Sequence, residues 1–273
     1  MVLDLRLKED WLSGDNQFLF YTYRILCSSC RTNRNRFYHS SFFSFTIVLQ
    51  MKTALFDLDG VLIDTEGQYE AFWRKIGKEF LPEHPSFAQE IKGMSLVQIY
   101  QTYFPGLESL QKEMTYRLNA FEQEMHYPIF ESVLPFLKRL QEIHVRCAVV
   151  TSSNREKMKK VYAEHPKLSS YFCDIFTAES VRRSKPMPDC YLNAAKALEV
   201  APEKCVVFED SINGLKAGRD SGAKVVALAT SLSREVLTNR VNYTLYDMLV
   251  DDFSQIVPEL LFADDRPYFK IMK

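Results

Sequence analysis

Four short polar stretches, far apart in the sequence, combine residue types that can handle a phosphoryl group. They are Asp57-Leu58-Asp59-Gly60, Thr151-Ser152-Ser153, Lys185-Pro186 and Glu209-Asp210. Three of them lie at the end of apolar runs, and the lysine comes just before a helix-like segment. In a parallel α/β sheet, ligands bind outside the carboxyl ends of the strands. Each stretch alone is weak evidence, but all four in this order indicate one active site.

The pair Asp57 and Asp59 predicts nucleophilic attack coupled to proton transfer. A carboxylate at the end of a strand can attack phosphorus and form an aspartyl-phosphate, which divides a hydrolysis into two easier steps. Asp59 is near enough to protonate the leaving oxygen and then to deprotonate the attacking water. Gly60 permits a tight turn that brings backbone N–H groups near the phosphate. A calcium loop is the alternative interpretation, but residues 61–63 are apolar and supply no further oxygen ligands.

The acidic pair Glu209-Asp210 predicts a metal site shared with these carboxylates. In isolation, such a pair is most simply an acidic helix start. If the strand ends are adjacent, however, four carboxylates converge, and two unit charges about 4 Å apart repel by roughly 4 kcal/mol at an effective dielectric near 20. The cluster therefore needs a counter-cation. An all-oxygen ligand set favours a hard ion, and Mg²⁺ is the expected one for phosphoryl chemistry.

Lys185 and the turn at Thr151 provide positive charge and hydrogen-bond donors. Prolines at positions 186 and 188 limit the freedom of the lysine's loop, so its ammonium can neutralise a phosphate oxygen while also pairing with the nucleophile. Thr151 and the N–H groups of Ser152 and Ser153 form a donor set at a strand-to-helix turn. Ordinary N-capping of a helix that begins near Asn154 is compatible with that role.

The elements that position these residues can be read from the apolar pattern. Runs without polar alternation predict strands of a parallel sheet that is covered on both faces. They occupy residues 54–56, 147–150, 205–208 and 225–228. Helical signals between the runs lie at residues 133–140, 189–198 and 211–221. The predicted fold class is therefore α/β: a doubly wound, Rossmann-like parallel-sheet core with an inserted all-helical domain.

The insertion lies between Asp59 and Thr151, which are 92 positions apart, far more than one crossover requires. Amphipathic spacing predicts helices in this segment at residues 69–80, 91–103 and 112–125. Because the insertion follows the first acidic loop directly, we interpret it as a cap over the active site; a decorative subdomain is the alternative. The predicted domains are a core of 51–64 and 134–250, a cap of 65–133, an N-terminal extension of 1–50 (disordered or upstream of a start at Met51) and a C-terminal tail of 251–273.

Composition limits the partners. The 273-residue chain has a net charge of −1 and a pI of about 6.5, so we expect neither a nucleic-acid partner nor binding to an anionic membrane. In the first fifty residues, the longest apolar stretch, residues 42–49, is too short to span a bilayer, and no secretory signal pattern is present. Six scattered cysteines favour a reducing, cytoplasmic compartment. We expect a monomer that acts on a small phosphorylated metabolite.

The four stretches resemble the four motifs of the haloacid-dehalogenase-like superfamily, and the segment from Phe208 to Gly218 is especially specific. The resemblance covers Met51 to about Asp247. The position of the helical cap resembles the subgroup that contains β-phosphoglucomutase and many sugar-phosphate phosphatases. The resemblance implies the following roles: Asp57 is the nucleophile and a metal ligand, Asp59 is the acid/base and binds metal through its carbonyl, Asp210 with Glu209 holds the metal, and Thr151 and Lys185 bind phosphate.

The same resemblance bears on the substrate. The mutase has a histidine where this chain has Tyr69, and an arginine where this chain has Leu96. Both departures remove groups expected to hold or transfer a second phosphate. Lys92, Gly93 and Ser95 are candidates for cap contacts with the leaving group, although a solvated helix start is an equally good interpretation.

The sequence therefore predicts a Mg²⁺-dependent phosphatase for a small, sugar-like phosphorylated metabolite. A β-phosphoglucomutase-like phosphotransferase and a pyrophosphatase are alternatives. A non-catalytic phospholigand-binding protein is the least favoured, because both Asp57 and Asp59 are retained. Asp59 also argues against a dehalogenase, which needs no acid for its leaving group.

Overall fold

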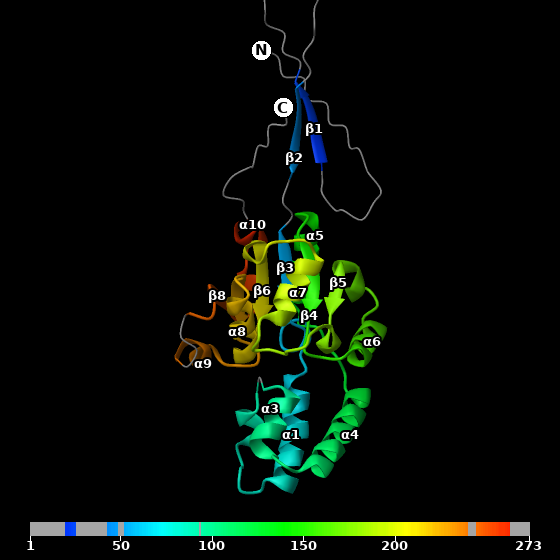
Figure 1. Ribbon diagram of the computed structural model, residues 1–273, viewed down its shortest axis with the longest axis vertical. Coiled ribbons are helices and arrows are strands. Elements are labelled where there is room, and N and C mark those ends of the chain that lie inside the picture. Colours follow the sequence, from blue (N-terminus) through cyan, green and yellow to red (C-terminus); the bar gives the residue numbers. More distant parts are fainter. Residues whose placement is uncertain (1–19, 26–42, 49–51, 93, 240–243, 263–273) are drawn as a thin grey trace, which may run out of the picture. The chain divides into compact units, whose positions relative to one another are not determined.

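The computed structural model describes residues 20–25, 43–48, 52–92, 94–239 and 244–262. In the first 51 residues, strands β1 (Phe20–Ile25) and β2 (Phe43–Val48) form an antiparallel pair (Figure 1). The rest of the predicted N-terminal extension lies outside the described residues, as does Gly93. Residues 52–262 form a compact unit of their own.

A six-stranded parallel sheet forms the centre of this unit, in the order β5-β4-β3-β6-β7-β8. Its strands are β3 (Thr53–Phe56), β4 (Arg146–Val150), β5 (Asp174–Phe176), β6 (Cys205–Glu209), β7 (Lys224–Leu228) and β8 (Met248–Val250). The four apolar runs of the sequence are the four inner strands, so the predicted doubly wound sheet is confirmed. The strand order reverses direction at β3, and ligands bind at such a switch point.

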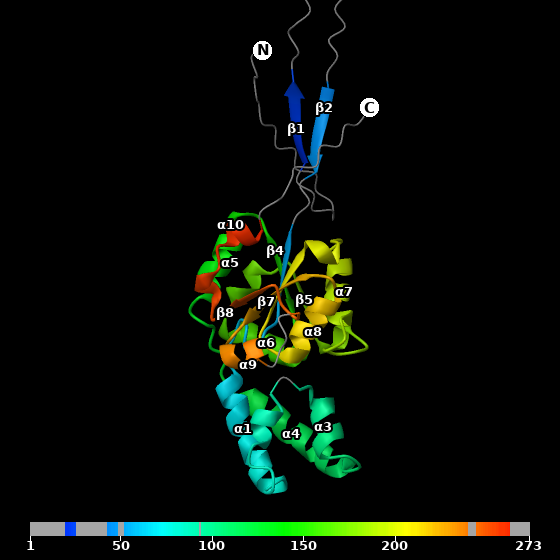
Figure 2. The same cartoon turned by 90° about the vertical axis from the view of Figure 1, so that its left-hand side faces the viewer.

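Helices cover both faces of the sheet. They are α5 (Val133–Glu142), α6 (Arg155–Glu164), α7 (Asp189–Ala197), α8 (Ile212–Asp220), α9 (Arg234–Asn239) and α10 (Pro258–Leu261). One apolar cluster joins α5 and α6 to the face that carries Phe56, and the other joins α7 and α8 to the face that carries Leu55. Figure 2 shows α5 and α10 on one side of the sheet and α7 and α8 on the other. The alternation of buried side chains along β3 therefore supplies both cores.

Residues 253–262 extend the core on the sheet face that carries Phe56. Phe253, Ile256 and Phe262 are buried in it, although they belong to segment 251–273, which was predicted to be a C-terminal tail. The Phe253 ring lies 5.9 Å from that of Phe56 and 4.6 Å from that of Phe136, centroid to centroid. Aromatic packing thus anchors residues 253–262 to the sheet.

The insertion between β3 and α5 is helical. It contains α1 (Glu66–Phe80), α2 (Phe87–Glu90), α3 (Leu96–Tyr103) and α4 (Glu108–Glu124). These helices have an apolar cluster of their own, which includes Trp73, Phe87, Phe104 and Met114. Figures 1 and 2 both show α1, α3 and α4 as a group beyond one end of the sheet. The insertion is therefore a helical unit with its own core.

The predicted start of one helix in the insertion is wrong. The segment expected to be helical from Ile91 forms a helix only from Leu96. Ser95 caps that helix: its Oγ accepts a hydrogen bond from the Gln98 N–H at 3.3 Å, and the Gln98 Oε1 accepts from the Ser95 N–H at 2.8 Å. This reciprocal capping box fixes the helix start and leaves the residues before it as a loop.

None of the described helices combines the length and the apolar character that a membrane-spanning helix requires.

Candidate active site

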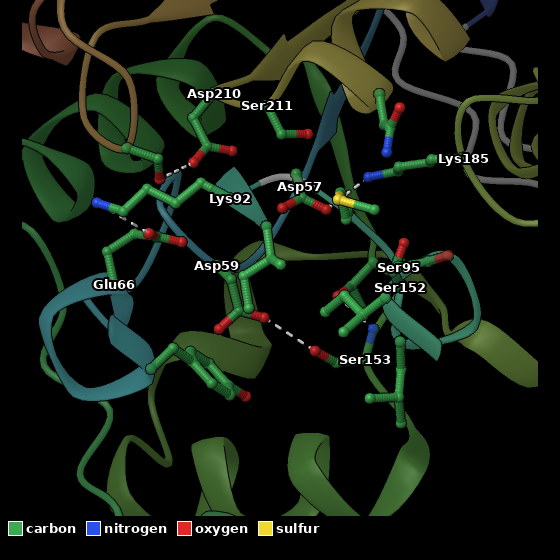
Figure 3. Close-up of a pocket in the computed structure, with 18 of the residues that line it drawn as sticks. Asp57, Asp59, Glu66, Lys92, Ser95, Ser152, Ser153, Lys185, Asp210 and Ser211 are labelled. Carbon is green, nitrogen blue, oxygen red and sulfur yellow. Dashed lines mark hydrogen bonds and ion pairs between the residues drawn. The ribbon is translucent and has the colours of Figure 1, made fainter. Parts of the chain in front are cut away.

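The loops that follow β3, β4 and β6 meet at one rim of the sheet, and Figure 3 shows their side chains around a common space. Asp57 follows β3, and its N–H continues the ladder by donating to the Phe208 carbonyl at 3.0 Å. Glu209 ends β6 and Asp210 follows it. Carboxylate oxygens of Asp57, Glu209 and Asp210 all lie within 4.8 Å of one another. The structure thus brings three of the four predicted acidic residues into one cluster.

Lys185 reaches this cluster from the loop before α7. Its Nζ donates to Asp57 Oδ1 at 2.5 Å, to Glu209 Oε1 at 2.6 Å and to the Val150 carbonyl at 3.1 Å. Tyr191 donates from its hydroxyl to the same Glu209 oxygen at 2.7 Å. Burial lowers the pKa of Lys185, but the charges of Asp57 and Glu209 outweigh it and raise that pKa well above its usual value. Lys185 is therefore a permanent cation beneath the nucleophile candidate.

One ammonium does not balance three buried carboxylates. Burial raises the pKa of Asp57 to about 7, against the opposing charge of Lys185 and with a further contribution from Glu209. Burial, followed by the charges of Glu209 and Asp57, raises the pKa of Asp210 well above its usual value. Such groups ionise fully only beside another positive charge. Since all the candidate ligands are oxygen atoms, the cluster fits a hard divalent cation such as Mg²⁺.

Asp59 lies outside this cluster and has its own partners. Its Oδ1 accepts from the Thr65 hydroxyl and from Lys157 Nζ, each at 2.6 Å, and its Oδ2 accepts from the Ser153 hydroxyl at 2.8 Å. Burial raises the pKa of Asp59, but the Lys157 charge and these hydrogen bonds outweigh it and hold the pKa below its usual value. Without a metal, two aspartates two residues apart therefore have opposite pKa shifts: burial favours the protonated form of Asp57, whereas Lys157 and the hydrogen bonds favour the ionised form of Asp59, which is the form that can act as a base.

Gly60 is explained by its conformation and its neighbours. Its φ is +74°, and a Cβ at this position would lie 1.9 Å from Asp210 Oδ2. Its N–H donates to the Ile63 carbonyl at 2.8 Å, and its carbonyl accepts from the Thr230 hydroxyl. Both the left-handed backbone and the close approach of Asp210 therefore require glycine at this position.

Gly214, in α8, has a similar role beside Glu209. A Cβ here would lie 1.9 Å from the Glu209 Cδ, so only glycine lets the helix pack over this carboxylate. Glu209 also accepts from the Asp210 N–H at 3.2 Å and from the Ser211 hydroxyl at 3.2 Å. The start of α8 thus holds Glu209 in place.

We expect Gly214→Ala to destabilise the protein by about 1–3 kcal/mol, because the methyl group overpacks the site. Its matched control is Gly67→Ala in α1, where nothing lies within 4 Å of the new Cβ. That substitution, in the first turn of α1, should instead stabilise by up to about 0.5–1 kcal/mol, because alanine loses less conformational freedom than glycine in a helix. Denaturant unfolding of the two variants measures whether each substitution lowers or raises the free energy of unfolding. Stabilisation by both substitutions would contradict this assignment.

Thr151, Ser152 and Ser153 form the turn after β4. The Thr151 N–H donates to the Phe176 carbonyl at 2.9 Å, and its Oγ1 accepts from the Ser153 N–H at 3.0 Å. Thr151 and Ser152 line the space in front of Asp57. Asn154 caps α6 by accepting from the Lys157 N–H at 2.9 Å, so the predicted helix start is confirmed. The turn therefore combines capping with access to the site.

A cavity of about 440 Å³ lies between these loops and the helical insertion. Among the predicted cap residues, Tyr69, Lys92 and Ser95 line it. Lys92 pairs with Glu70 at 3.0 Å and lies 4.0 Å from Glu66, and Figure 3 shows its ammonium pointing toward Glu66 rather than toward Asp57. The insertion thus forms one wall of the space that faces the nucleophile candidate.

Several residues that contact the site residues or line the cavity were not predicted, among them Glu66, Lys157, Tyr191 and Ser231. The Ser231 hydroxyl donates to Asp210 Oδ2. Ser231 had a usable signal, because it follows the apolar run 225–228 as the other loops follow theirs. Lys157 had none, since it lies among several lysines of α6.

Comparisons with known proteins agree with this geometry. The family model for haloacid dehalogenase-like hydrolases matches residues 51–222. The bifunctional riboflavin kinase/FMN phosphatase of Arabidopsis thaliana is 30% identical over 188 residues, which are 64% of this chain and 47% of that protein, so the chain spans about half the length of that relative. Hexitol phosphatase A of Escherichia coli is 29% identical over 205 residues, covering 73% of this chain and 93% of that protein.

A solved structure shows the same fold. The β-phosphoglucomutase of Clostridium difficile superposes with a TM-score of 0.60 at 22% identity, covering 77% of this chain and 95% of that chain. The resemblance drawn from the four motifs is confirmed, as is the prediction of an enzyme. Because the matched model covers more than half of the sequence, this chain belongs to the haloacid dehalogenase-like hydrolase family.

Proposed function

We propose that this protein is a Mg²⁺-dependent phosphatase that hydrolyses a small phosphorylated metabolite, a sugar or polyol phosphate, through an aspartyl-phosphate on Asp57. The observation that supports it best is the contact of Asp57 with Lys185, beside Asp210, at the wall of a cavity that the insertion closes on the other side. A nucleophile, a fixed cation and a set of oxygen ligands thus face one space of metabolite size.

In the first step, a carboxylate oxygen of Asp57 attacks phosphorus and the ester P–O bond breaks. Asp59 gives its proton to the departing oxygen, so the alcohol leaves neutral. In the second step, Asp59 takes a proton from water, whose oxygen attacks the same phosphorus. The bond between Asp57 and phosphorus then breaks, and inorganic phosphate is released.

Lys185 holds one oxygen of Asp57 throughout and offsets negative charge that develops near it. Thr151 and Ser152, which line the cavity, are the proposed donors to the phosphoryl oxygens. Asp57, Asp210, Glu209 and the carbonyl of Asp59 would hold Mg²⁺. When bound, the ion would supply the positive charge that the buried carboxylates and the phosphoryl group need.

The insertion is proposed to act as the cap that excludes water and selects the leaving group. Lys92 is a cationic residue of the insertion that lines the cavity, and it is already paired with Glu70 and lies near Glu66. A second phosphate would therefore meet two carboxylates, whereas hydroxyl groups could donate to them. This charge balance favours a phosphatase over a bisphosphate-dependent mutase. The name of the hexitol phosphatase relative supports a polyol phosphate as substrate.

The test is a screen of phosphate esters with the full chain. It includes hexitol and hexose phosphates, FMN, glycerol phosphate and pyrophosphate, with release of inorganic phosphate as the readout. We expect release from hexitol or hexose phosphates that stops with a chelator and returns with Mg²⁺. Release that is indifferent to chelation, or isomerisation of a hexose phosphate without release, would contradict the proposal.

The raised pKa of Asp57 predicts that Mg²⁺ affinity depends on pH. Because this pKa is about 7 without metal, the carboxyl holds a proton below pH 7, and Mg²⁺ must displace it. We expect affinity to weaken by at least roughly tenfold per pH unit below 7, because the Asp210 carboxyl, whose pKa is also raised well above its usual value, must lose a proton as well. Calorimetric titration with Mg²⁺ between pH 6 and 8 measures this. In Asp57→Asn the pH dependence of Mg²⁺ affinity should be weaker. An affinity of the wild-type protein that does not change across that pH range would refute the prediction.

A further inference from the structure

Lys157 is a buried lysine that the proposed steps do not use. It lies in the first turn of α6, and its side chain is 2% exposed. A buried ammonium is costly unless it is paired and hydrogen-bonded. Its surroundings therefore have to be specific, and its partners indicate what it does.

One partner is Asp59, whose Oδ1 accepts from Lys157 Nζ at 2.6 Å. The other is the Tyr69 hydroxyl, also at 2.6 Å, which in turn donates to Glu122 Oε1 at 2.8 Å. The Lys157 Nζ also lies 4.7 Å from the centre of the Tyr69 ring. A polar chain thus runs from Asp59 through Lys157 and Tyr69 to Glu122.

The members of this chain come from four different elements. Asp59 belongs to the loop after β3 and Lys157 to α6, whereas Tyr69 is in α1 and Glu122 is in α4. Lys157 is therefore fixed from the side of the insertion, while Thr65 and Ser153 hold Asp59 only through hydroxyl groups. Among the described residues, three side chains contact the Asp59 carboxylate, and Lys157 is the charged one.

We propose that Lys157 is a positioning residue for the acid/base Asp59, an inference that rests on the proposed function. Lys157 and Thr65 occupy Oδ1, so the transferable proton is placed on Oδ2. The Ser153 hydroxyl beside Oδ2 can accept or donate a hydrogen bond, and so it is compatible with both protonation states of Asp59. The proton moves from Asp59 Oδ2 to the leaving oxygen and is replaced from water.

Leaving-group dependence tests this role. The wild-type chain and Lys157→Met are compared, with Mg²⁺, on p-nitrophenyl phosphate and on sorbitol 6-phosphate, or on the alkyl ester hydrolysed fastest in the screen. An alkoxide needs the acid and p-nitrophenolate does not. We expect kcat/KM for the alkyl ester to fall by roughly 10–100-fold, within the range of general acid catalysis, and that for p-nitrophenyl phosphate by less than about threefold.

Non-additivity separates positioning from a structural effect. If Lys157 acts through Asp59, Lys157→Met should cost nothing more in an Asp59→Asn background. The control is Lys159→Met, on the same helix but with a side chain that is 71% exposed, which should leave both esters unaffected. Tyr69→Phe removes the hydroxyl that fixes Lys157. It should also lower kcat/KM more for the alkyl ester than for p-nitrophenyl phosphate, but by a smaller factor than Lys157→Met does. This variant provides the test if Lys157→Met does not fold.

Equal losses on both esters, or additive losses in the Asp59→Asn background, would overturn the role of Lys157 while leaving the proposed function intact. Hydrolysis that survives Asp57→Asn would overturn the proposed function, and this inference with it.

Discussion

Replacing Asp57 by Asn should abolish turnover, with kcat lower by at least roughly 10⁴-fold, as is usual when a nucleophile is removed. The amide has nearly the same shape as the carboxylate, so the fold should persist. The metal-free variant should be no less stable than wild type at pH 8, because burial raises the pKa of the Asp57 carboxyl to about 7 and its ionisation there opposes folding. Phosphate release and thermal unfolding measure the two effects.

The matched control for this substitution is Asp64→Asn. Asp64 lies in the same connection but is exposed. Its substitution should leave kcat within about twofold of wild type, as expected for a surface position. Turnover by Asp57→Asn at a rate comparable with that of this control would exclude an aspartyl-phosphate on residue 57.

Lys185→Met should have the second-largest effect, on both activity and stability. Met fills a similar volume but leaves Asp57 and Glu209 without the ammonium that both contact. Removing one partner of a buried ion pair typically destabilises by about 3–5 kcal/mol. Loss of a charge at the reacting group should lower kcat by roughly 10²–10³-fold.

Metal dependence gives this prediction a second readout. With Lys185 gone, the carboxylates lack a neighbouring cation, so Mg²⁺ should stabilise the variant against unfolding more than it stabilises wild type. Lys196→Met, at the exposed end of α7, is the control and should change neither property. Wild-type kcat in Lys185→Met, or a smaller stabilisation by Mg²⁺, would show that Lys185 is not the counter-charge.

The sequence is informative where function and strand position coincide. Asp57, Thr151 and Glu209 could be placed because each ends an apolar run, and inner parallel strands are read from such runs. Strands β5 and β8 have three residues each and lie at the sheet edges, so their apolar signal is too short to recognise. The inner sheet was thus predictable, whereas its edges were not.

Long-range side-chain pairing is what the sequence leaves open. Lys157 and Asp59 are 98 positions apart, and nothing in the run of lysines on α6 marks the one that is buried. Lys92 was expected to contact the leaving group, yet acidic residues of α1 pair with it. Gly214 lies in the first turn of α8, where the sequence alone gives no reason for a glycine, and the packed Glu209 side chain explains it.

The separate apolar core of the insertion has a consequence for how this protein can change. Trp73, Phe87 and Met114 pack with one another within the insertion, while the two sheet faces have their own clusters. Substitutions within that helical module should be energetically independent of substitutions around Asp210. Under the proposed cap role, ligand preference can therefore drift, or be exchanged by grafting the module from a relative, while the machinery at the strand ends is inherited intact.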